Sequence, residues 1–234
     1  MTTTVVYGDA ADGSVRSGGD DYVYASARSG AALYAATGGT VETFGQMDWS
    51  YQGDYWVDQF LVYEFFLSFD TSALTSGATV SAAVLRVTSA DDRTTTDFTI
   101  EARLRDWGAT LTTADWVAGA SLSGLTLLGS YATSGGFTTG TGYDLSDTAM
   151  AANINKTGST RMLLCSSRTV SGTDPTGEEY VNIRAADYTG TTSDPVLTVT
   201  HAAGGSTLFL MLEDDSGAYE LEDDSGGILL EPGA

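Results

Sequence analysis

The segment 57–69 constrains the fold more than any other part of the chain, because its apolar side chains recur at nearly every second position. One face carries Val57, Leu61, Tyr63, Phe65, Leu67 and Phe69, interrupted only by Gln59. A repeat of two places these residues on one face of a β-strand, whereas a helix would spread them around its axis. The opposite face, from Asp58 to Asp70, mixes polar and apolar residues. We therefore expect one face in the core and the other covered in part by a loop or another chain.

Short apolar runs separated by turns rich in Gly, Ser and Thr fill most of the remaining chain, a pattern typical of many short strands. Opening hairpins are expected between Val5 and Tyr34, and later strands at 79–88, 98–106, 160–166, 179–184 and 195–201. A long loop is expected at 37–58, and one short helix, capped by Ser146 or Asp144, is expected to end near Asn155. The predicted fold class is all-β: an antiparallel, jelly-roll-like β-sandwich with a small C-terminal β-meander.

The expected strand 98–106 shows the alternation clearly. Its apolar positions are Phe98, Ile100, Ala102 and Leu104, and its polar positions are Thr99, Glu101, Arg103 and Arg105. A strand with this pattern normally buries one face and leaves the other in water. We therefore expect the polar face to meet solvent.

A change in composition divides the chain. Residues 1–201 are expected to form the sandwich, 202–206 (AAGGS) a linker, and 207–234 a separate acidic tail without Lys or Arg. Leu-Glu recurs at 212, 221 and 230, a nine-residue period that favours a small meander of strands joined by acidic turns.

Such a small ribbon is marginally stable alone, so we expect the tail to mediate assembly. The predicted contact residues are Leu208, Phe209, Leu210, Met211, Leu212, Tyr219, Leu221, Ile228 and Leu230. The expected partner is another copy of the chain, with a trimer favoured.

Charge and rare residues exclude several classes of function. The net charge of -21, with ten basic residues in total, disfavours nucleic acid as a partner. Cys165 is the only cysteine and His201 the only histidine, which excludes an intramolecular disulfide, a Cys/His zinc site and a His-based catalytic triad. The sequence shows neither a signal peptide nor an apolar run of about 18 residues, so we expect synthesis in a cytoplasm and no membrane partner.

The segment FLSFDTSALTSGATVSAAVLRV, residues 66–87, resembles the hallmark of the DNRLRE-type β-sandwich, a domain related to carbohydrate-binding modules. In that family an Arg-containing strand ends in Phe-Asp-x-Ser, followed by a Gly-Ala-Thr-Val/Ile turn and an Ala-x-Leu-x-Leu/Val strand. The matching residues here are Phe69, Asp70, Ser72, Gly77 to Val80, Ala83, Leu85 and Val87. Glu64 and Ser68 stand at positions where the family usually has basic residues.

Three further segments, 106–120, 154–168 and 178–201, look like the same domain as it occurs in tail and other virion proteins of bacteriophages, as do the acidic repeats. The resemblance implies a virion structural protein, a capsid decoration or tail component, made in the host cytoplasm. Its implied partners are copies of itself, other virion proteins and host surface glycans. The alternative is a glycan-binding adhesion module for attachment to the host surface.

The loop expected at 37–58 holds the candidate glycan-binding residues. These are Trp49, Tyr51, Tyr55 and Trp56, flanked by Gln46, Asp48, Gln52 and Asp54. Aromatic faces beside amides and carboxylates suit sugar rings. The same rings also suit packing against their own domain or a neighbouring subunit.

The remaining candidates are acidic turns that could bind a metal and side chains that could be catalytic. Asp9, Asp12, Asp20 and Asp21, and the tail residues Asp214, Asp215, Asp223 and Asp224, offer oxygen ligands. Neither the EF-hand loop nor the calcium-binding nonapeptide is present, and Asp is a common turn residue, so no metal or other cofactor is expected. His201 and Cys165 are expected to be structural, and no pattern places two acids for glycoside hydrolysis. We therefore expect no enzymatic activity.

Overall fold

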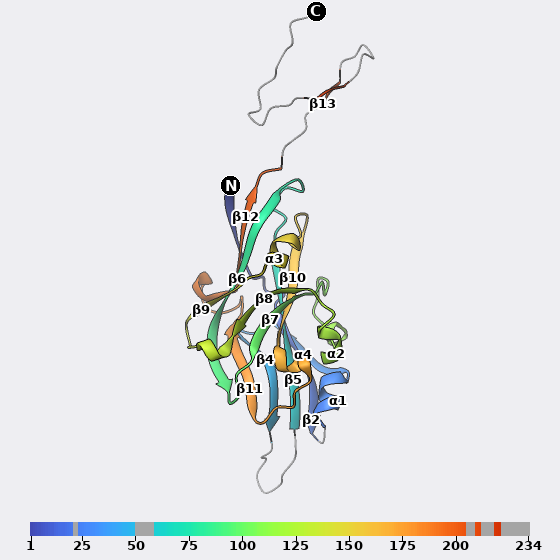
Figure 1. Ribbon diagram of the computed structural model, residues 1–234, viewed down its shortest axis with the longest axis vertical. Helices are drawn as coiled ribbons and strands as arrows, with labels where there is room; N and C mark the ends of the chain where they lie inside the picture. The colour runs from blue at the N-terminus through green and yellow to red at the C-terminus, as the bar shows by residue number, and fades with distance from the viewer. Residues whose placement is uncertain (21–22, 50–58, 205–208, 212–217, 221–234) are drawn as a thin grey trace, which may run out of the picture.

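The computed structural model describes residues 1–20, 23–49, 59–204, 209–211 and 218–220. Most of them form one antiparallel sheet of 12 strands (Figure 1). Its strands are β1 (Thr2–Tyr7), β2 (Gly13–Asp20), β3 (Ala32–Thr37), β4 (Val41–Trp49), β5 (Gln59–Asp70), β6 (Thr79–Thr94), β7 (Thr99–Leu104), β8 (Leu127–Ala132), β9 (Gly142–Leu145), β10 (Ser159–Ser166), β11 (Glu178–Arg184) and β12 (Val196–Ala202). The helices are α1 (Tyr24–Ser29), α2 (Gly119–Leu122), α3 (Thr148–Ala152) and α4 (Ser167–Ser171), with 3-10 turns η1 (Thr113–Asp115), η2 (Thr133–Gly135) and η3 (Thr191–Ser193). The predicted all-β class is confirmed.

The sheet divides at β5, the strand predicted from the repeat of two. One edge of β5 pairs with β2 from Gln59 to Phe66. The other edge pairs with β4 as far as Tyr63, and with β10 from Phe65 onward. Strand β10 continues into β7 and β8, whereas β4 continues into β11, β6, β12 and β1. The two layers expected of a sandwich are therefore joined in one curled sheet (Figure 1).

The main core lies between these two branches. Phe65, Leu67 and Phe69 of β5 are fully buried there, on the face that the sequence predicts. The strands of the two branches contribute Phe44, Leu85, Val87, Ile100, Leu128, Leu145, Met162, Leu164, Val181, Ile183, Leu197 and Val199. Burying each large apolar side chain stabilises the fold by roughly 1.5–3 kcal/mol. This core holds the two branches of the sheet together.

The second face of β5 is covered by the chain's own segments. Phe66 packs in a smaller cluster with Val15, Trp107, Leu111, Val117, Leu122, Leu163 and Cys165. Val62 packs against Tyr24 and Ala27 of α1. The sequence left open whether a loop or another chain covers this face, and the structure assigns α1, α2 and the segment 106–117 to it. Cys165 is a buried core residue, as predicted.

The long strand β6 connects the two ends of the molecule. Its 16 residues span about 50 Å at roughly 3.3 Å per residue. Thr79 pairs with Ala202 at one end, where β1 begins and β12 stops. Thr94 pairs with Glu179 at the other end, where α1 and α4 lie (Figure 1). We call these ends the terminal pole and the distal pole.

The C-terminal tail forms a separate small sheet. β13 (Phe209–Met211) pairs with β14 (Ala218–Glu220), which agrees with the first hairpin of the expected meander. The expected meander has three strands, at 207–213, 218–222 and 227–231, and the last of these lies outside the described residues. In Figure 1, β13 lies beyond the terminal pole, away from the 12-stranded sheet.

Two expectations about the first 58 residues were wrong. Of the expected opening hairpins, the first does not form, because β1 pairs with β12 and not with β2, whereas β2 and β3 do pair antiparallel, with α1 in place of a simple turn between them. The loop expected at 37–58 contains the nine-residue strand β4. Its repeat of two is hidden because Glu42 and Gln46 are polar yet buried.

Two further details differ from expectation. The polar face of 98–106 is covered, since Arg103 is only 7% exposed and donates to Glu101 and to the Leu125 carbonyl. The helix at 148–152 is capped by Asp147, which accepts from the Ala149 amide, and not by Ser146 or Asp144. None of the helices in the described part of the chain has the length and apolar character needed to cross a membrane.

Candidate functional site

The predicted glycan-binding residues fall largely outside the described part of the chain. Trp49 is the last residue of β4 and pairs with Gln59, whereas Tyr51, Tyr55 and Trp56 are not among the described residues. Of the predicted assembly residues, Phe209, Leu210, Met211 and Tyr219 belong to β13 and β14. Leu208, Leu212, Leu221, Ile228 and Leu230 lie outside the described residues. These assignments stay predictions.

A row of tyrosine and arginine residues crosses six strands of the sheet on one continuous face, which we call the outer face. On β11 and β6 this face is turned away from the main core, whereas on β5 it is the side that also carries Phe65, beyond the point where the partner of β5 changes from β4 to β10. The row follows direct cross-strand pairs: Tyr34 opposite Arg16, Arg16 opposite Tyr63, Tyr63 opposite Gly45, Gly45 opposite Tyr180, and Tyr180 opposite Arg93. It therefore spans β3, β2, β5, β4, β11 and β6. We call these six residues the tyrosine–arginine row. No sequence pattern indicated it, because its members come from six separate strands.

Arg16 lies between two rings of the row. Its guanidinium carbon is 5.5 Å from the ring centre of Tyr34 and 5.9 Å from that of Tyr63. Such contacts contribute about 0.5–1 kcal/mol each at exposed sites. In the described part of the chain Arg16 takes part in no ion pair, and its buried Nε has no hydrogen-bond partner. The positive charge therefore orders two rings without being neutralised by a carboxylate.

Gly45 lies between Tyr63 and Tyr180 in the row and carries no side chain. Its φ of +125° is in the region that favours glycine, and a Cβ there would lie 2.5 Å from the Glu179 carbonyl oxygen and 2.7 Å from Tyr180 Cα. Burial raises the pKa of Tyr180, with smaller contributions from Glu178 and Tyr63 in the same direction. Tyr63 and Tyr180 therefore lie on the two strands that flank Gly45, on the same face of the sheet.

We expect Gly45→Ala to lower the free energy of unfolding by about 1–3 kcal/mol, because alanine is strained at this φ and its methyl group collides with the β11 backbone. Urea denaturation of the variant and the parent protein measures this difference. Gly108→Ala is the matched control: Gly108 also has a positive φ of +83° but no atom within 4 Å of the added carbon. If both variants lose the same free energy of unfolding, the collision of the methyl group with the β11 backbone contributes nothing.

A row of hydrogen-bonding groups runs beside the tyrosine–arginine row, two residues further along the strands. Thr43 lies opposite Asn182, and Asn182 lies opposite Asp91. The Thr43 hydroxyl donates to Asn182 Oδ1 at 2.7 Å, and Arg93 pairs with Asp91 at 2.6 Å. The outer face thus places hydroxyl, amide and carboxylate groups next to aromatic rings.

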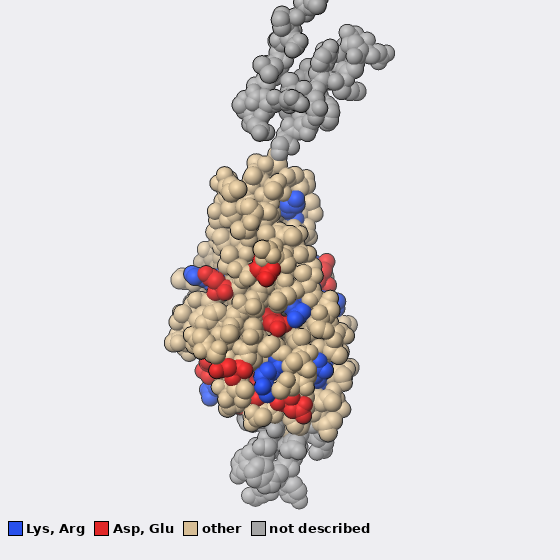
Figure 2. All heavy atoms as spheres, in the orientation of Figure 1, with Lys and Arg blue, Asp and Glu red and all other residues tan. Residues whose placement is uncertain are grey.

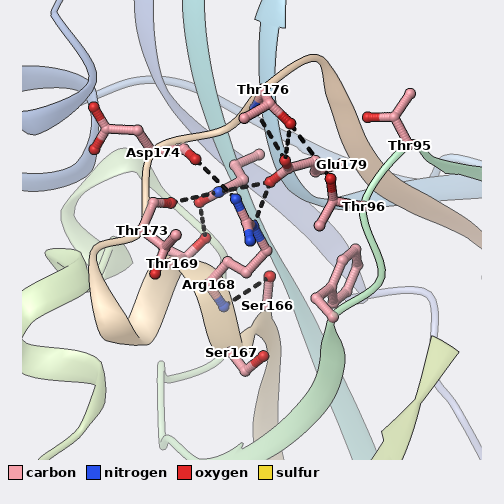
Figure 3. Close-up of polar contacts among 12 residues, drawn as sticks. Thr95, Thr96, Ser166, Ser167, Arg168, Thr169, Thr173, Asp174, Thr176 and Glu179 are labelled. Atoms are coloured by element: carbon pink, nitrogen blue, oxygen red, sulfur yellow. Dashed lines mark hydrogen bonds and ion pairs between the residues drawn. The ribbon is translucent and has the colours of Figure 1, made fainter. Parts of the chain in front are cut away.

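A buried polar network lies on the opposite side of the same strands (Figure 3). Glu179, next to Tyr180, has no exposed surface, and its Oε2 accepts from Arg168 Nε at 2.5 Å and from Gln46 Nε2 at 3.0 Å. Its Oε1 accepts from the Thr176 amide at 2.9 Å and from the Thr176 hydroxyl at 3.1 Å. The sequence placed Gln46 beside a ligand-binding loop, but it is fully buried and accepts from Tyr24 and Thr169.

Arg168 connects this network to the distal pole. It belongs to α4, and its Nη2 donates to the carbonyl of Asp174 in the loop that precedes β11. Figure 3 shows α4, this loop and β11 meeting around the guanidinium. The network therefore holds β4 and β11 in place beneath the tyrosine–arginine row.

A second feature of the outer face lies closer to the terminal pole. A hollow of about 430 Å³ is lined by Val84, Arg86, Asp144, Val196 and Thr198. Arg86 and Asp144 form a bidentate ion pair there, with distances of 2.7 and 3.1 Å. Tyr7, which pairs with Val196, is 47% exposed beside it. The hollow is open, and half of each charged side chain meets solvent.

Buried acids occur elsewhere, but they do not form a metal centre. Glu64 is fully buried: its Oε2 accepts from the Val117 amide, its Oε1 has no partner among the described residues, and burial raises its pKa well above the usual value. Within the ranges that the structure describes, no three acidic, histidine or cysteine side chains are grouped to hold a metal ion. His201 bonds Thr4 across the β1–β12 pair, a structural position.

Charged groups are sparse on the side of the molecule shown in Figure 2, and basic and acidic side chains lie close to one another there. No broad patch of one sign is visible on that side. Comparison of the chain with protein-family models and with curated proteins finds no match. The functional argument therefore depends on the residues of this chain.

Proposed function

We propose that the chain is a structural protein of a bacteriophage virion, a capsid decoration or tail component, that displays its β-sandwich on the particle surface. The observation that carries this proposal is the polarity of the molecule. Both ends of the sandwich chain lie at the terminal pole, since Thr2 pairs with His201, and β13 lies beyond it. The tyrosine–arginine row lies on strands that extend to the distal pole. One end is thus available for attachment while the rest of the body is displayed.

Assembly through the tail is part of this proposal. The tail is apolar between its acidic turns, and a two-stranded ribbon of this size gains little stability by itself. Docking on copies of the chain, with a trimer favoured, or on other virion proteins buries that apolar surface. The acidic turns discourage edge-to-edge aggregation before assembly.

Deleting residues 206–234 is expected to abolish both oligomer formation and incorporation into particles, because it removes the proposed docking strands. Light scattering after size exclusion measures the mass in solution, and negative-stain images of antibody-labelled particles show incorporation. Replacing the acids of the tail by their amides is the control, since it keeps the apolar strands. Unchanged mass and labelling after deletion would refute the role of the tail, and the absence of any labelled particle with the full chain would refute the virion proposal.

A second function, binding of host surface glycans, is favoured by a specific observation. The tyrosine–arginine row and the adjacent Thr43, Asn182 and Asp91 combine aromatic faces with hydrogen-bonding groups, as sugar sites do. A glycan array with the parent protein and with Trp49→Ala and Trp56→Ala variants tests this function. Binding that is lost in both variants supports the aromatic segment 49–56 as the contact, and the absence of any binding removes this function.

A further inference from the structure

The spacing of the tyrosine–arginine row carries a more specific inference, which rests on the glycan-binding function proposed above. Tyr34, Tyr63 and Tyr180 occupy alternate strands, separated by Arg16 and by Gly45. Neighbouring strands lie about 4.8 Å apart, so successive tyrosine positions are about 10 Å apart. That distance matches two units of an extended β-1,4-linked sugar chain. In such a chain alternate sugars are turned over, so the same ring face recurs at every second unit.

We propose that the outer face of β3, β2, β5, β4 and β11 binds a neutral, extended β-1,4-linked glycan, with its sugar rings against Tyr34, Tyr63 and Tyr180. Arg16 holds the first two rings by its contacts at 5.5 and 5.9 Å and donates hydrogen bonds to sugar hydroxyls. Gly45, which has no side chain, lies between Tyr63 and Tyr180 in the row, where the intervening sugar passes. Asn182 and Thr43 bond the hydroxyls along one side.

Two observations favour this occupant over a protein. Arg16 and Gly45 separate the rings and Thr43 and Asn182 border them, whereas the fully buried centre of a protein interface is more apolar. The row also shows aromatic rings one at a time rather than as a continuous patch, which suits a polymer that alternates ring faces and hydroxyls.

The net charge of the chain and the twist of the sheet define the ligand further. The chain carries a net charge of -21, so a polyanionic glycan is repelled at long range despite the positive charge of Arg16 in the row, and a neutral glycan is not. Successive strands are rotated by about 20–25°, so the three tyrosine positions turn progressively. A soluble single chain can follow that turn, whereas a flat crystalline surface cannot.

Affinity electrophoresis of the full chain in gels containing hydroxyethylcellulose tests the proposal, with carboxymethylcellulose as a charged polymer of the same backbone. We expect retardation by the neutral polymer, at least tenfold weaker binding of the charged one, and no adsorption to microcrystalline cellulose. Tyr34→Ala and Tyr63→Ala are each expected to weaken binding about tenfold. Tyr63→Phe keeps the ring and is expected to retain binding. Tyr7→Ala is the matched control, an exposed tyrosine of the same face outside the row.

Three results would overturn the proposal. The first is that hydroxyethylcellulose does not retard the protein. The second is that carboxymethylcellulose binds as well as the neutral polymer. The third is that Tyr34→Ala and Tyr63→Ala bind like Tyr7→Ala although circular dichroism shows them folded. If Trp49→Ala and Trp56→Ala lose binding while the row variants keep it, the glycan function stands but its site is the segment 49–56. Particle labelling is independent of all these outcomes.

Discussion

The free energy of unfolding is expected to fall as the pH rises from 5 to 9, and Asp12→Asn is expected to remove much of that fall. Asp12 lies in the turn between β1 and β2 and is only 2% exposed. Its Oδ1 accepts from the Ser68 amide at 2.9 Å, but its buried Oδ2 has no partner among the described residues. Burial, with smaller contributions from Asp9, Asp187 and Glu42, raises the pKa of Asp12 to about 9 despite the opposing bond from the Ser68 amide. The folded protein therefore keeps this carboxyl protonated at neutral pH.

The sign follows from proton linkage. Below the pKa of the unfolded chain, near 3.8, both states carry the proton and the folded state is not penalised. Between that value and the folded pKa of about 9, only the folded state binds the proton, so stability decreases with rising pH. One such group contributes a slope of at most about 1.4 kcal/mol per pH unit.

Urea unfolding at several pH values measures this effect in the parent protein and in Asp12→Asn. The asparagine keeps an oxygen for the Ser68 amide and does not ionise, so its free energy of unfolding relative to that of the parent is expected to rise from pH 5 to pH 9. Asp174→Asn is the control, because Asp174 is exposed and its carbonyl, not its carboxylate, accepts from Arg168. An unchanged slope in Asp12→Asn would contradict the protonated state of Asp12.

Glu64 is expected to cause the decrease in the free energy of unfolding with pH that remains in Asp12→Asn. It is fully buried, and burial raises its pKa well above the usual value despite the opposing bond from the Val117 amide and the charge of Arg105. Its stabilising contribution is therefore also lost as the pH rises. Adding Glu64→Gln to Asp12→Asn should flatten the profile further.

Removing Arg168 is expected to destabilise the protein by about 3–5 kcal/mol, because Arg168→Met leaves the Glu179 carboxylate buried without its cationic partner. Glu179 has no exposed surface, and its remaining donors are the Gln46 amide and the Thr176 amide and hydroxyl. Glu179→Gln in the Arg168→Met background removes the unpaired charge and should recover part of the loss. Without the guanidinium, α4 and the loop before β11 should also exchange their amide hydrogens faster, because the guanidinium joins these two segments.

Chemical denaturation of the single and double variants measures the loss and the recovery, and hydrogen exchange at β11 and α4 reports the local effect. Arg86→Met is the matched control, because Arg86 pairs with Asp144 at the surface, where both side chains are half exposed. Such a pair contributes about 0–1 kcal/mol. Equal losses for the two arginines would show that the buried network does not anchor the distal pole.

Some elements could be predicted because their information is local. The repeat of two in β5 identified the strand and the core face of Phe65, Leu67 and Phe69. The strand β4 was missed because Glu42 and Gln46 face inward, and polar residues break the apolar pattern. They are tolerated inside only because Ser14, Glu179 and Tyr24 arrive from distant segments to bond them. The burial of Arg103 could not be predicted either, because its acceptor, the Leu125 carbonyl, comes from another part of the chain.

The candidate site could not be predicted from the sequence. Each member of the tyrosine–arginine row is an ordinary strand residue by itself, and only the register of six strands places them side by side. The sequence by itself determined that the chain forms strands, which of their faces are apolar and which zinc and triad chemistries are excluded, because these follow from period and residue counts. The tertiary structure decided the fork at β5, the buried network and the row, because each depends on backbone pairing between segments that are far apart in the chain.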